Sequence, residues 1–151
     1  MMRAELLHTG RPGGKSKFTS KYLDAPLEPL YPFGYGLSYT TYAYTGRKVE
    51  KREDGIHVFV SVTNTGGRDG DEIVQCYVRH MTGRRVRPVR QLKDFTKISL
   101  KAGETKTVTF VVPFAGLSYY DWEMKEMPAE GILRIYAGGD SQAELVGQVV
   151  L

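Results

Sequence analysis

The chain is poor in the residues from which metal sites and disulfides are built. Cys76 is the single cysteine, so an intrachain disulfide and a cysteine-based metal site are both excluded. The three histidines, His8, His57 and His80, lack the spacing of a metal-binding pair. The sequence also has no serine-centred nucleophile elbow and no phosphate-binding loop. We therefore expect no metal and no cofactor.

Long apolar runs are absent as well. No stretch approaches the roughly 20 apolar residues that span a bilayer, so we expect no membrane partner. Residues 1–10 contain no apolar run like that of a signal peptide, which predicts a cytoplasmic location. The net charge of +4 comes from 21 basic and 17 acidic residues. This mild bias does not indicate a nucleic-acid partner.

What the sequence does contain is a series of strand signals separated by turns. Ile56, Val58, Val60 and Val62 alternate with residues of a second face, which is the period of a half-buried strand. Short strands at regular spacing, with no convincing helix, are typical of an all-β, immunoglobulin-like antiparallel sandwich. Residues 1–29 are rich in turn formers and charge, which predicts an irregular N-terminal extension. The predicted strands cover residues 38–49, 56–63, 72–78, 92–100, 105–112, 131–137 and 143–151.

Three parts of the sequence carry a resemblance to a known family. They are Pro29–Thr40, then Val62–Gly66 with Gly70–Val78, then Arg87–Phe95 with Leu100–Thr105. In this order and spacing they resemble the C-terminal end of family three glycoside hydrolases, the β-glucosidases. The resemblance runs from about Gly10 to the C-terminus.

This resemblance implies a fibronectin type III-like sandwich over residues 38–151, preceded by a tail and interdomain linker over residues 1–37. It also implies two catalytic domains that this sequence lacks. One is a barrel with the nucleophilic aspartate, and the other is an α/β sandwich with the acid/base glutamate. Residues 9–12 resemble the closing stretch of the second of these. By this resemblance the chain is a fragment, not an enzyme by itself, and an accessory domain that braces the catalytic domains.

The linker motif has a physical logic of its own. Pro32 favours extended backbone at the residue before it, and Gly34 and Gly36 allow backbone angles closed to other residues. Large aromatic side chains with polar tips can hold one domain against another. We therefore predict interdomain contacts, with sugar contacts as the alternative. Exposed in an isolated chain, the same patch predicts a homodimer. The aromatic residues are Tyr31, Phe33, Tyr35 and Tyr39.

A second functional class is a carbohydrate-binding module. Tyr119, Tyr120 and Trp122 would then form a platform on which a sugar ring stacks. The alternative is that this stretch packs over one end of the sandwich, because buried tryptophan and tyrosine often keep one polar tip satisfied. We expect the packed arrangement, and the exposure of Trp122 decides between the two.

The remaining reactive or charged residues have structural interpretations. Cys76 is predicted to be a buried, inert thiol, and His57 a surface histidine. Asn64–Gly66 predicts a turn with glycine at positive φ, and Asp69–Glu72 a solvated turn, too short for a calcium loop. Four acidic residues are weighed as a glycosidase pair and interpreted as loop charges, namely Asp121, Glu123, Glu126 and Glu130. The basic run is interpreted as a solvated loop or a contact with the missing domains, and comprises Arg79, Arg84, Arg85, Arg87, Arg90 and Lys93.

Overall fold

The computed structural model describes residues 29–81 and 88–151, and the chain divides into two compact units, 1–32 and 33–151. The predicted irregular extension therefore lies outside the described residues, except for Pro29. Within the described ranges, no helix has the length and apolarity needed to cross a membrane. All the strands of the described residues belong to the second unit.

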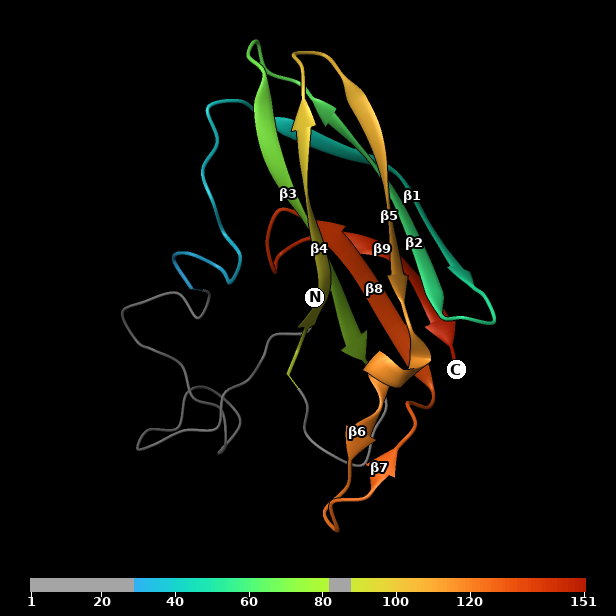
Figure 1. Cartoon of the computed structure of the whole chain (residues 1–151). Helices are drawn as coiled ribbons and strands as arrows, with labels where there is room; N and C mark the ends of the chain where they lie inside the picture. The colour runs from blue at the N-terminus through green and yellow to red at the C-terminus, as the bar shows by residue number, and fades with distance from the viewer. Residues whose placement is uncertain (1–28, 82–87) are drawn as a thin grey trace, which may run out of the picture. The chain divides into compact units, whose positions relative to one another are not determined.

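The second unit contains three described antiparallel sheets, and the two larger ones face each other as layers (Figure 1). The smaller of these two has the order β1-β2-β5 and the larger the order β4-β3-β8-β9. The predicted all-β antiparallel sandwich is confirmed. The bounds of the small sheet are β1 Tyr42–Lys51, β2 Ile56–Asn64 and β5 Thr105–Val112; those of the large sheet are β3 Gly70–His80, β4 Gln91–Leu100, β8 Ile132–Gly138 and β9 Glu144–Val150.

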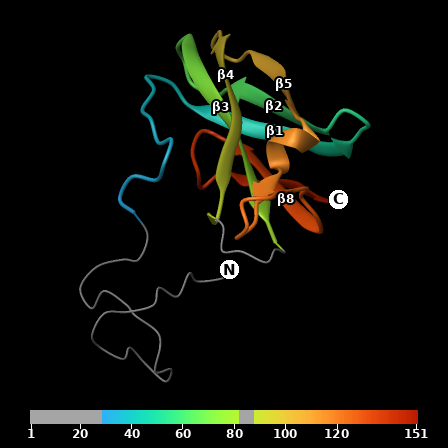
Figure 2. The same cartoon turned by 60° about the horizontal axis from the view of Figure 1, so that its bottom comes forward.

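Two further elements fill the connection between β5 and β8. A single 3₁₀ turn, η1 (Phe114–Leu117), follows Pro113, and a short hairpin pairs β6 (Tyr119–Tyr120) with β7 (Glu126–Met127). The alternation of apolar residues does not predict this hairpin, because its strands are two residues long. Figure 1 shows the hairpin projecting from the sandwich beside η1, and Figure 2 turns this end towards the viewer.

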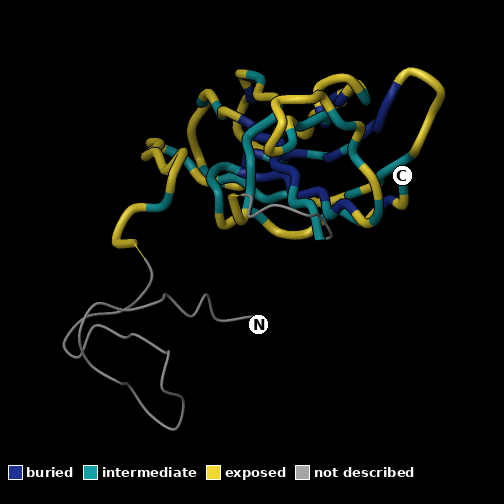
Figure 3. Tube along the Cα trace, turned by 90° about the horizontal axis from the view of Figure 1, so that it is seen from below, coloured by how far each residue is buried: buried dark blue, intermediate teal, exposed yellow. Residues whose placement is uncertain are grey.

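The core lies between the two sheets and follows the alternation of each strand. Every second residue of β2, from Ile56 to Val62, is fully buried, as the sequence predicts. Burying apolar area between sheets is the dominant favourable term in folding. Figure 3 shows this buried backbone surrounded by exposed loops. The other large buried residues include Val74, Val78, Leu100, Phe110, Leu117, Leu133 and Ile135.

The middle of strand β3, residues 74–78, is buried on both of its faces. Val74, Cys76 and Val78 belong to the core between the sheets. Gln75 and Tyr77 point the other way, yet they are only 6% and 1% exposed. Their cover is formed by the segment that precedes β1 and by the turn between β8 and β9, both of which hydrogen-bond to Gln75.

The turns after β2 and β4 are joined by Asn64, which is completely buried. Its side-chain nitrogen donates to the carbonyls of Arg68 and Leu100, and its side-chain oxygen accepts from the Gly66 amide at 3.1 Å. Gly66 does not adopt the positive φ that the sequence predicts. Glycine is needed there for space, because a Cβ would lie 2.1 Å from Thr40 Oγ1. Positive φ occurs instead at Gly103, in the turn between β4 and β5.

Candidate interaction surface

The segment before β1, residues 33–41, lies on the outer face of β3; we call it the linker segment. Its first end is held by Gln75. The Gln75 Nε2 donates to the Gly34 carbonyl at 3.0 Å and to the Gly139 carbonyl at 2.5 Å, while its Oε1 accepts from the Tyr77 hydroxyl at 2.5 Å. The Ser141 amide donates to the Phe33 carbonyl at 2.8 Å. The linker segment is therefore tied to both β3 and the β8–β9 turn.

The second end of the linker segment is held at the turn after β2. Thr40 Oγ1 donates to Asn64 Oδ1 at 2.7 Å, and the Thr65 amide donates to the Thr41 carbonyl at 2.8 Å. Anchors at both ends leave residues 35–39 bridging between them. This arrangement holds an irregular backbone in one place without any pairing in a sheet.

The two glycines of the linker segment have different roles. Gly34 has φ of +81°, and a Cβ on it would lie 2.1 Å from Gln75 Oε1. The predicted need for glycine is confirmed there. Gly36 has no positive φ, and nothing lies within 4 Å of where its Cβ would stand. For Gly36 the prediction is wrong, because the backbone there is open on that side and in an ordinary conformation.

Beneath the bridging residues is a pocket of about 310 Å³. Its polar lining includes the carboxylates of Asp71, Glu72 and Asp140. The Tyr44 hydroxyl donates to Glu72. Burial raises the pKa of Glu72, and the hydrogen bond from Tyr44 opposes that rise. The pKa of Asp71 is held below its usual range by hydrogen bonds from Lys97 and Ser99.

The aromatic side chains that the sequence singles out on this segment are exposed. Phe33 is 68% and Tyr39 95% exposed, and Tyr35 is exposed to a smaller extent. Tyr31, which belongs to the first unit, is exposed as well. Sequence reasoning misses Leu37, which is 88% exposed. A row of uncovered large apolar side chains on a firmly held backbone is typical of a surface that contacts another molecule.

Two apolar residues of the large sheet lie beside this row. Ile73 of β3 lines the same pocket as Leu37, and Phe95 of β4 pairs in register with Gln75. Both Ile73 and Phe95 are exposed. The sequence places them in strands and does not indicate that their side chains face solvent. They extend the apolar surface from the linker segment onto the edge of the sheet.

The second predicted group, Tyr119, Tyr120 and Trp122, belongs to the β6–β7 hairpin. Trp122 is 78% exposed, so the expectation that it packs over the sandwich is wrong. The cause is the Asp121 side chain, whose Oδ1 accepts from the amides of Glu123 and Lys125, both at 2.9 Å. This local closure of the turn directs the tip outwards. Tyr119 is half-buried and Tyr120 is exposed.

The acidic residues weighed as catalytic candidates have local roles or lie on the surface. Asp121 closes the hairpin turn, and Glu126 accepts from the Ser118 hydroxyl at 2.5 Å. Glu123 is exposed. Within residues 29–81 and 88–151, no group of three or more histidine, cysteine, aspartate or glutamate side chains is placed to hold a metal.

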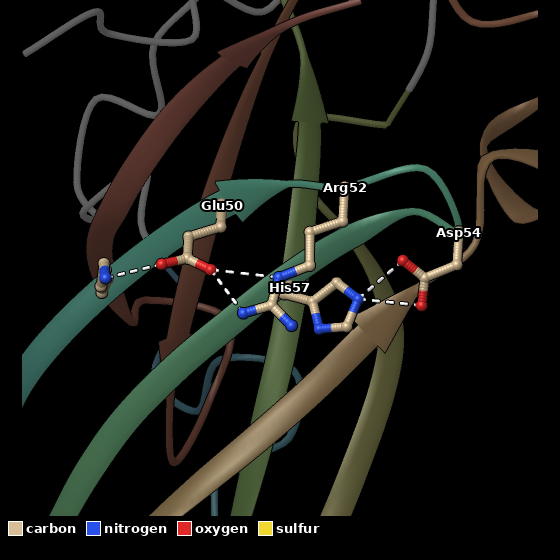
Figure 4. A network of polar contacts seen from close by, with 5 residues as sticks. Glu50, Arg52, Asp54 and His57 are labelled. Atoms are coloured by element: carbon tan, nitrogen blue, oxygen red, sulfur yellow. Dashed lines mark hydrogen bonds and ion pairs between the residues drawn. The ribbon is translucent and has the colours of Figure 1, made fainter.

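The prediction for His57 is wrong, and the prediction for Cys76 is confirmed. His57 is buried, and its Nε2 lies 2.9 Å from both carboxylate oxygens of Asp54, so the prediction of a surface histidine is wrong. Figure 4 shows this pair beside the ion pair of Glu50 and Arg52. Cys76 is fully buried as predicted, and burial raises the pKa of its thiol to about 12. A thiol with that pKa is inert at neutral pH.

The residues of the basic run do not share one environment. Arg84, Arg85 and Arg87 lie outside the described residues. Arg90 is not a solvated loop residue, because its guanidinium lies 3.8 Å from the centre of the Tyr136 ring and donates to the carbonyls of Ser141 and Ala143. It therefore braces the same β8–β9 turn that contacts the linker segment.

Comparisons with known proteins agree with this architecture. A family model described as a fibronectin type III-like domain matches residues 72–141. The periplasmic beta-glucosidase of Salmonella typhimurium is 42% identical over 142 residues, which cover 89% of this chain and 19% of that protein. The chain thus spans about a fifth of this relative's length.

Solved structures show the same relation. A beta-glucosidase from Listeria innocua, in complex with gluconolactone, matches with a TM-score of 0.80 and 34% identity, over 97% of this chain and 21% of that one. A GH3 beta-glucosidase from Bifidobacterium adolescentis matches with a TM-score of 0.72 and 36% identity, over 80% of this chain and 18% of that one.

Proposed function

We propose that this chain, a fibronectin type III-like domain of the family three glycoside hydrolases, docks through its linker segment onto the catalytic domains of a β-glucosidase and braces them. The family model that matches the chain is a fibronectin type III-like domain, and the chain spans about a fifth of the Salmonella relative. The chain is therefore not catalytic on its own. The activity belongs, in this proposal, to the rest of the enzyme.

The observation that carries this proposal is the linker segment itself. Phe33, Leu37 and Tyr39 are exposed on a backbone that is anchored at both ends. Exposed apolar surface of this kind is costly in water unless a partner covers it. The Salmonella relative is about five times longer than the region that matches, and in such an enzyme the remaining domains would cover this surface. The contact residues we propose on the linker segment are Phe33, Tyr35, Leu37 and Tyr39, and Tyr31, which belongs to the first unit, stays a separate predicted contact.

The compartment follows the parent enzyme in this proposal. The Salmonella relative is named a periplasmic enzyme. We therefore propose a periplasmic location for the parent of this chain, while the cytoplasmic location expected from the first residues stays a prediction. Measuring where the parent enzyme fractionates in its own cells decides between the two.

A chimera tests the docking. In the Salmonella β-glucosidase, the region that matches this chain is replaced by this chain, and hydrolysis of an aryl β-glucoside and thermal unfolding are measured. We expect an active chimera. The double variant Phe33→Asp, Leu37→Asp puts two carboxylates into the contact, and is expected to lower both activity and the unfolding temperature.

The matched control for the chimera is Val150→Asp, since Val150 is similarly exposed but lies on β9. If the double variant behaves like this control, the linker segment is not the docking surface. The isolated chain is assayed in parallel, and turnover above a mock-purified sample would contradict the accessory role.

A second candidate function, glycan binding at the β6–β7 hairpin, is favoured by the exposure of Trp122. An exposed indole on a turn closed by Asp121 presents a flat apolar face to solvent, suited to a pyranose ring. Trp122 is the single tryptophan, so its fluorescence reports on this site alone. Titration with cellotetraose should shift the emission in a saturable way. No shift up to millimolar sugar would exclude this candidate.

A further inference from the structure

We infer that Gln75 is a positioning residue that holds the docking surface in its binding conformation before any partner arrives. This inference rests on the proposed docking function, since it concerns how the linker segment is prepared for it. Its structural part can be tested in the isolated chain, where no partner is present.

Both hydrogen bonds that Gln75 donates are directed at other segments. Its amide nitrogen bridges two carbonyls, those of Gly34 and Gly139, which lie 41 and 64 residues away in sequence. Its oxygen accepts from Tyr77 on the same strand. An amide is the side chain that can donate twice and accept at once, so neither Glu nor Leu can replace it here.

We call the two hydrogen bonds from Gln75 to Gly34 and Gly139 the clamp. The β8–β9 turn, to which one of them leads, is itself held in place. The Ser141 amide donates to the Phe33 carbonyl, and the Ser141 carbonyl accepts from Arg90 at 2.6 Å. Arg90 also lies over the Tyr136 ring. The β8–β9 turn is therefore also braced by contacts that do not involve the linker segment, and Gln75 joins the two.

The position of Gln75 indicates that its hydrogen bonds fix the placement of the linker segment. It lies between the core residues Val74 and Cys76 and is 6% exposed, on a face where an apolar residue would satisfy burial. A buried amide is stabilising only in the one geometry that meets its partners. A surface already held in place loses less conformational entropy when it binds, so pre-organisation adds to affinity.

Hydrogen exchange in the isolated chain tests the clamp. The Ser141 amide is the reporter, because its hydrogen bond to Phe33 exists only while the linker segment is in place. Gln75→Glu keeps the shape of the side chain but removes both donors. We expect exchange at Ser141 to accelerate about tenfold to a hundredfold, as for loss of a buried hydrogen bond. The amides of Val58 and Val60 in β2 should keep their protection.

Two matched pairs of variants separate the clamp from general damage. Gln148→Glu makes the same change at an exposed position of β9 and should leave Ser141 unchanged. Gly34→Ala forces a Cβ into the space of Gln75 Oε1 and should release the linker segment, whereas Gly36→Ala meets open space and should not. If Ser141 is unprotected in the unsubstituted chain, or if Gln75→Glu leaves its protection intact, the inference is overturned.

The chimera with the Salmonella enzyme then connects the clamp to docking. With Gln75→Glu in the chimera, a lower apparent affinity between the domains should appear as a lower unfolding temperature, with Gln148→Glu unaffected. Release of Ser141 in the isolated chain, combined with an unchanged chimera, would overturn the docking role of Gln75. Failure of the Phe33→Asp, Leu37→Asp chimera test would instead count against the proposed function and leave the clamp standing.

Discussion

The two faces of the sheet β4-β3-β8-β9 are covered in different ways. On the inner face, Val74, Cys76 and Val78 pack against the smaller sheet through apolar side chains. On the outer face, Gln75 and Tyr77 are covered by the linker segment and the β8–β9 turn through hydrogen bonds. Apolar burial is strong but not directional, whereas hydrogen bonds are directional and weaker in net terms.

Each kind of cover suits a different purpose. The inner face supplies most of the stability, and many apolar residues of suitable size could fill it. The outer face places an irregular segment in one position and leaves Phe33, Leu37 and Tyr39 uncovered. Variants that separate stability from placement therefore test whether the two faces differ in this way.

The largest expected effect comes from truncating the inner core. Phe110 of β5 is 2% exposed and belongs to the core cluster. Phe110→Ala should lower the free energy of unfolding by about 3–5 kcal/mol, because it removes apolar contacts and leaves a cavity. Urea denaturation measures this. A loss below about 1 kcal/mol would mean that the core does not dominate the stability.

A smaller loss is expected at Asn64, where the linker segment meets the turns after β2 and β4. Asn64→Ala removes the acceptor for Thr40 and Gly66 and the donor for two carbonyls. We expect the free energy of unfolding to fall by about 1–3 kcal/mol, as buried groups lose their partners. Asn64→Asp is the companion variant: it keeps the acceptor but brings a buried carboxylate oxygen against the carbonyls of Arg68 and Leu100, so it should lower the free energy of unfolding at least as much as alanine does.

The pH dependence of unfolding should differ in sign between two glutamates. Hydrogen bonds from Lys48 and then Arg52 lower the pKa of Glu50 to about 2. Its contribution is therefore present above pH 4.5 and lost as the pH falls towards 2. Burial raises the pKa of Glu72 above 4.5, so its contribution is full below pH 4.5 and declines as the pH rises through the raised value.

Two glutamine variants measure this difference by urea denaturation in the acidic and neutral pH range. Relative to Glu50→Gln, the wild type should gain stability with rising pH in the acidic range. Relative to Glu72→Gln, it should lose stability with rising pH. The Glu50 effect should also shrink in high salt, because that side chain is exposed to screening by ions. Curves of the same sign for both variants would contradict the assigned causes.

The smallest effect on stability is expected on the uncovered surface. Leu37 is 88% exposed, so Leu37→Asp should change the free energy of unfolding by less than about 0.5 kcal/mol. It should nevertheless reduce self-association of the isolated chain, which the exposed linker segment is expected to promote. Sedimentation at several concentrations checks this, with Val150→Asp as the control. Equal self-association in both variants would show that the linker segment is not the contact.

Much of the sandwich can be predicted from local patterns. The alternation in β2 and β5 has a period of two residues, which assigns each side chain to a face before any partner strand is known. Cys76 can be placed in the core on the same basis. The β6–β7 hairpin and the burial of His57 cannot, because they depend on Asp121 closing a turn and on Asp54 reaching the imidazole.

The surface is predictable in its composition and not in its arrangement. The aromatic residues from Tyr31 to Tyr39 stand out in the sequence because large apolar side chains concentrate in an irregular, glycine-containing segment. Gln75 escapes sequence reasoning, although a lone amide between Val74 and Cys76 is a signal of a polar contact on the second face of a strand. Trp122 is expected from the sequence to be covered, and only the geometry of its turn shows that it is not.

The linear sequence is enough to recognise the strands, the residues of the core between the sheets and the family motifs. All three depend on spacing along the chain. Three features become visible only in the folded molecule: residues 74–78 of β3 are buried on both faces, Gly34 needs a positive φ while Gly36 does not, and Gln75 joins Gly34 to Gly139. Contacts between segments 41 and 64 residues apart leave no periodic trace in a sequence, since they arise from where the folded sheets bring the chain together.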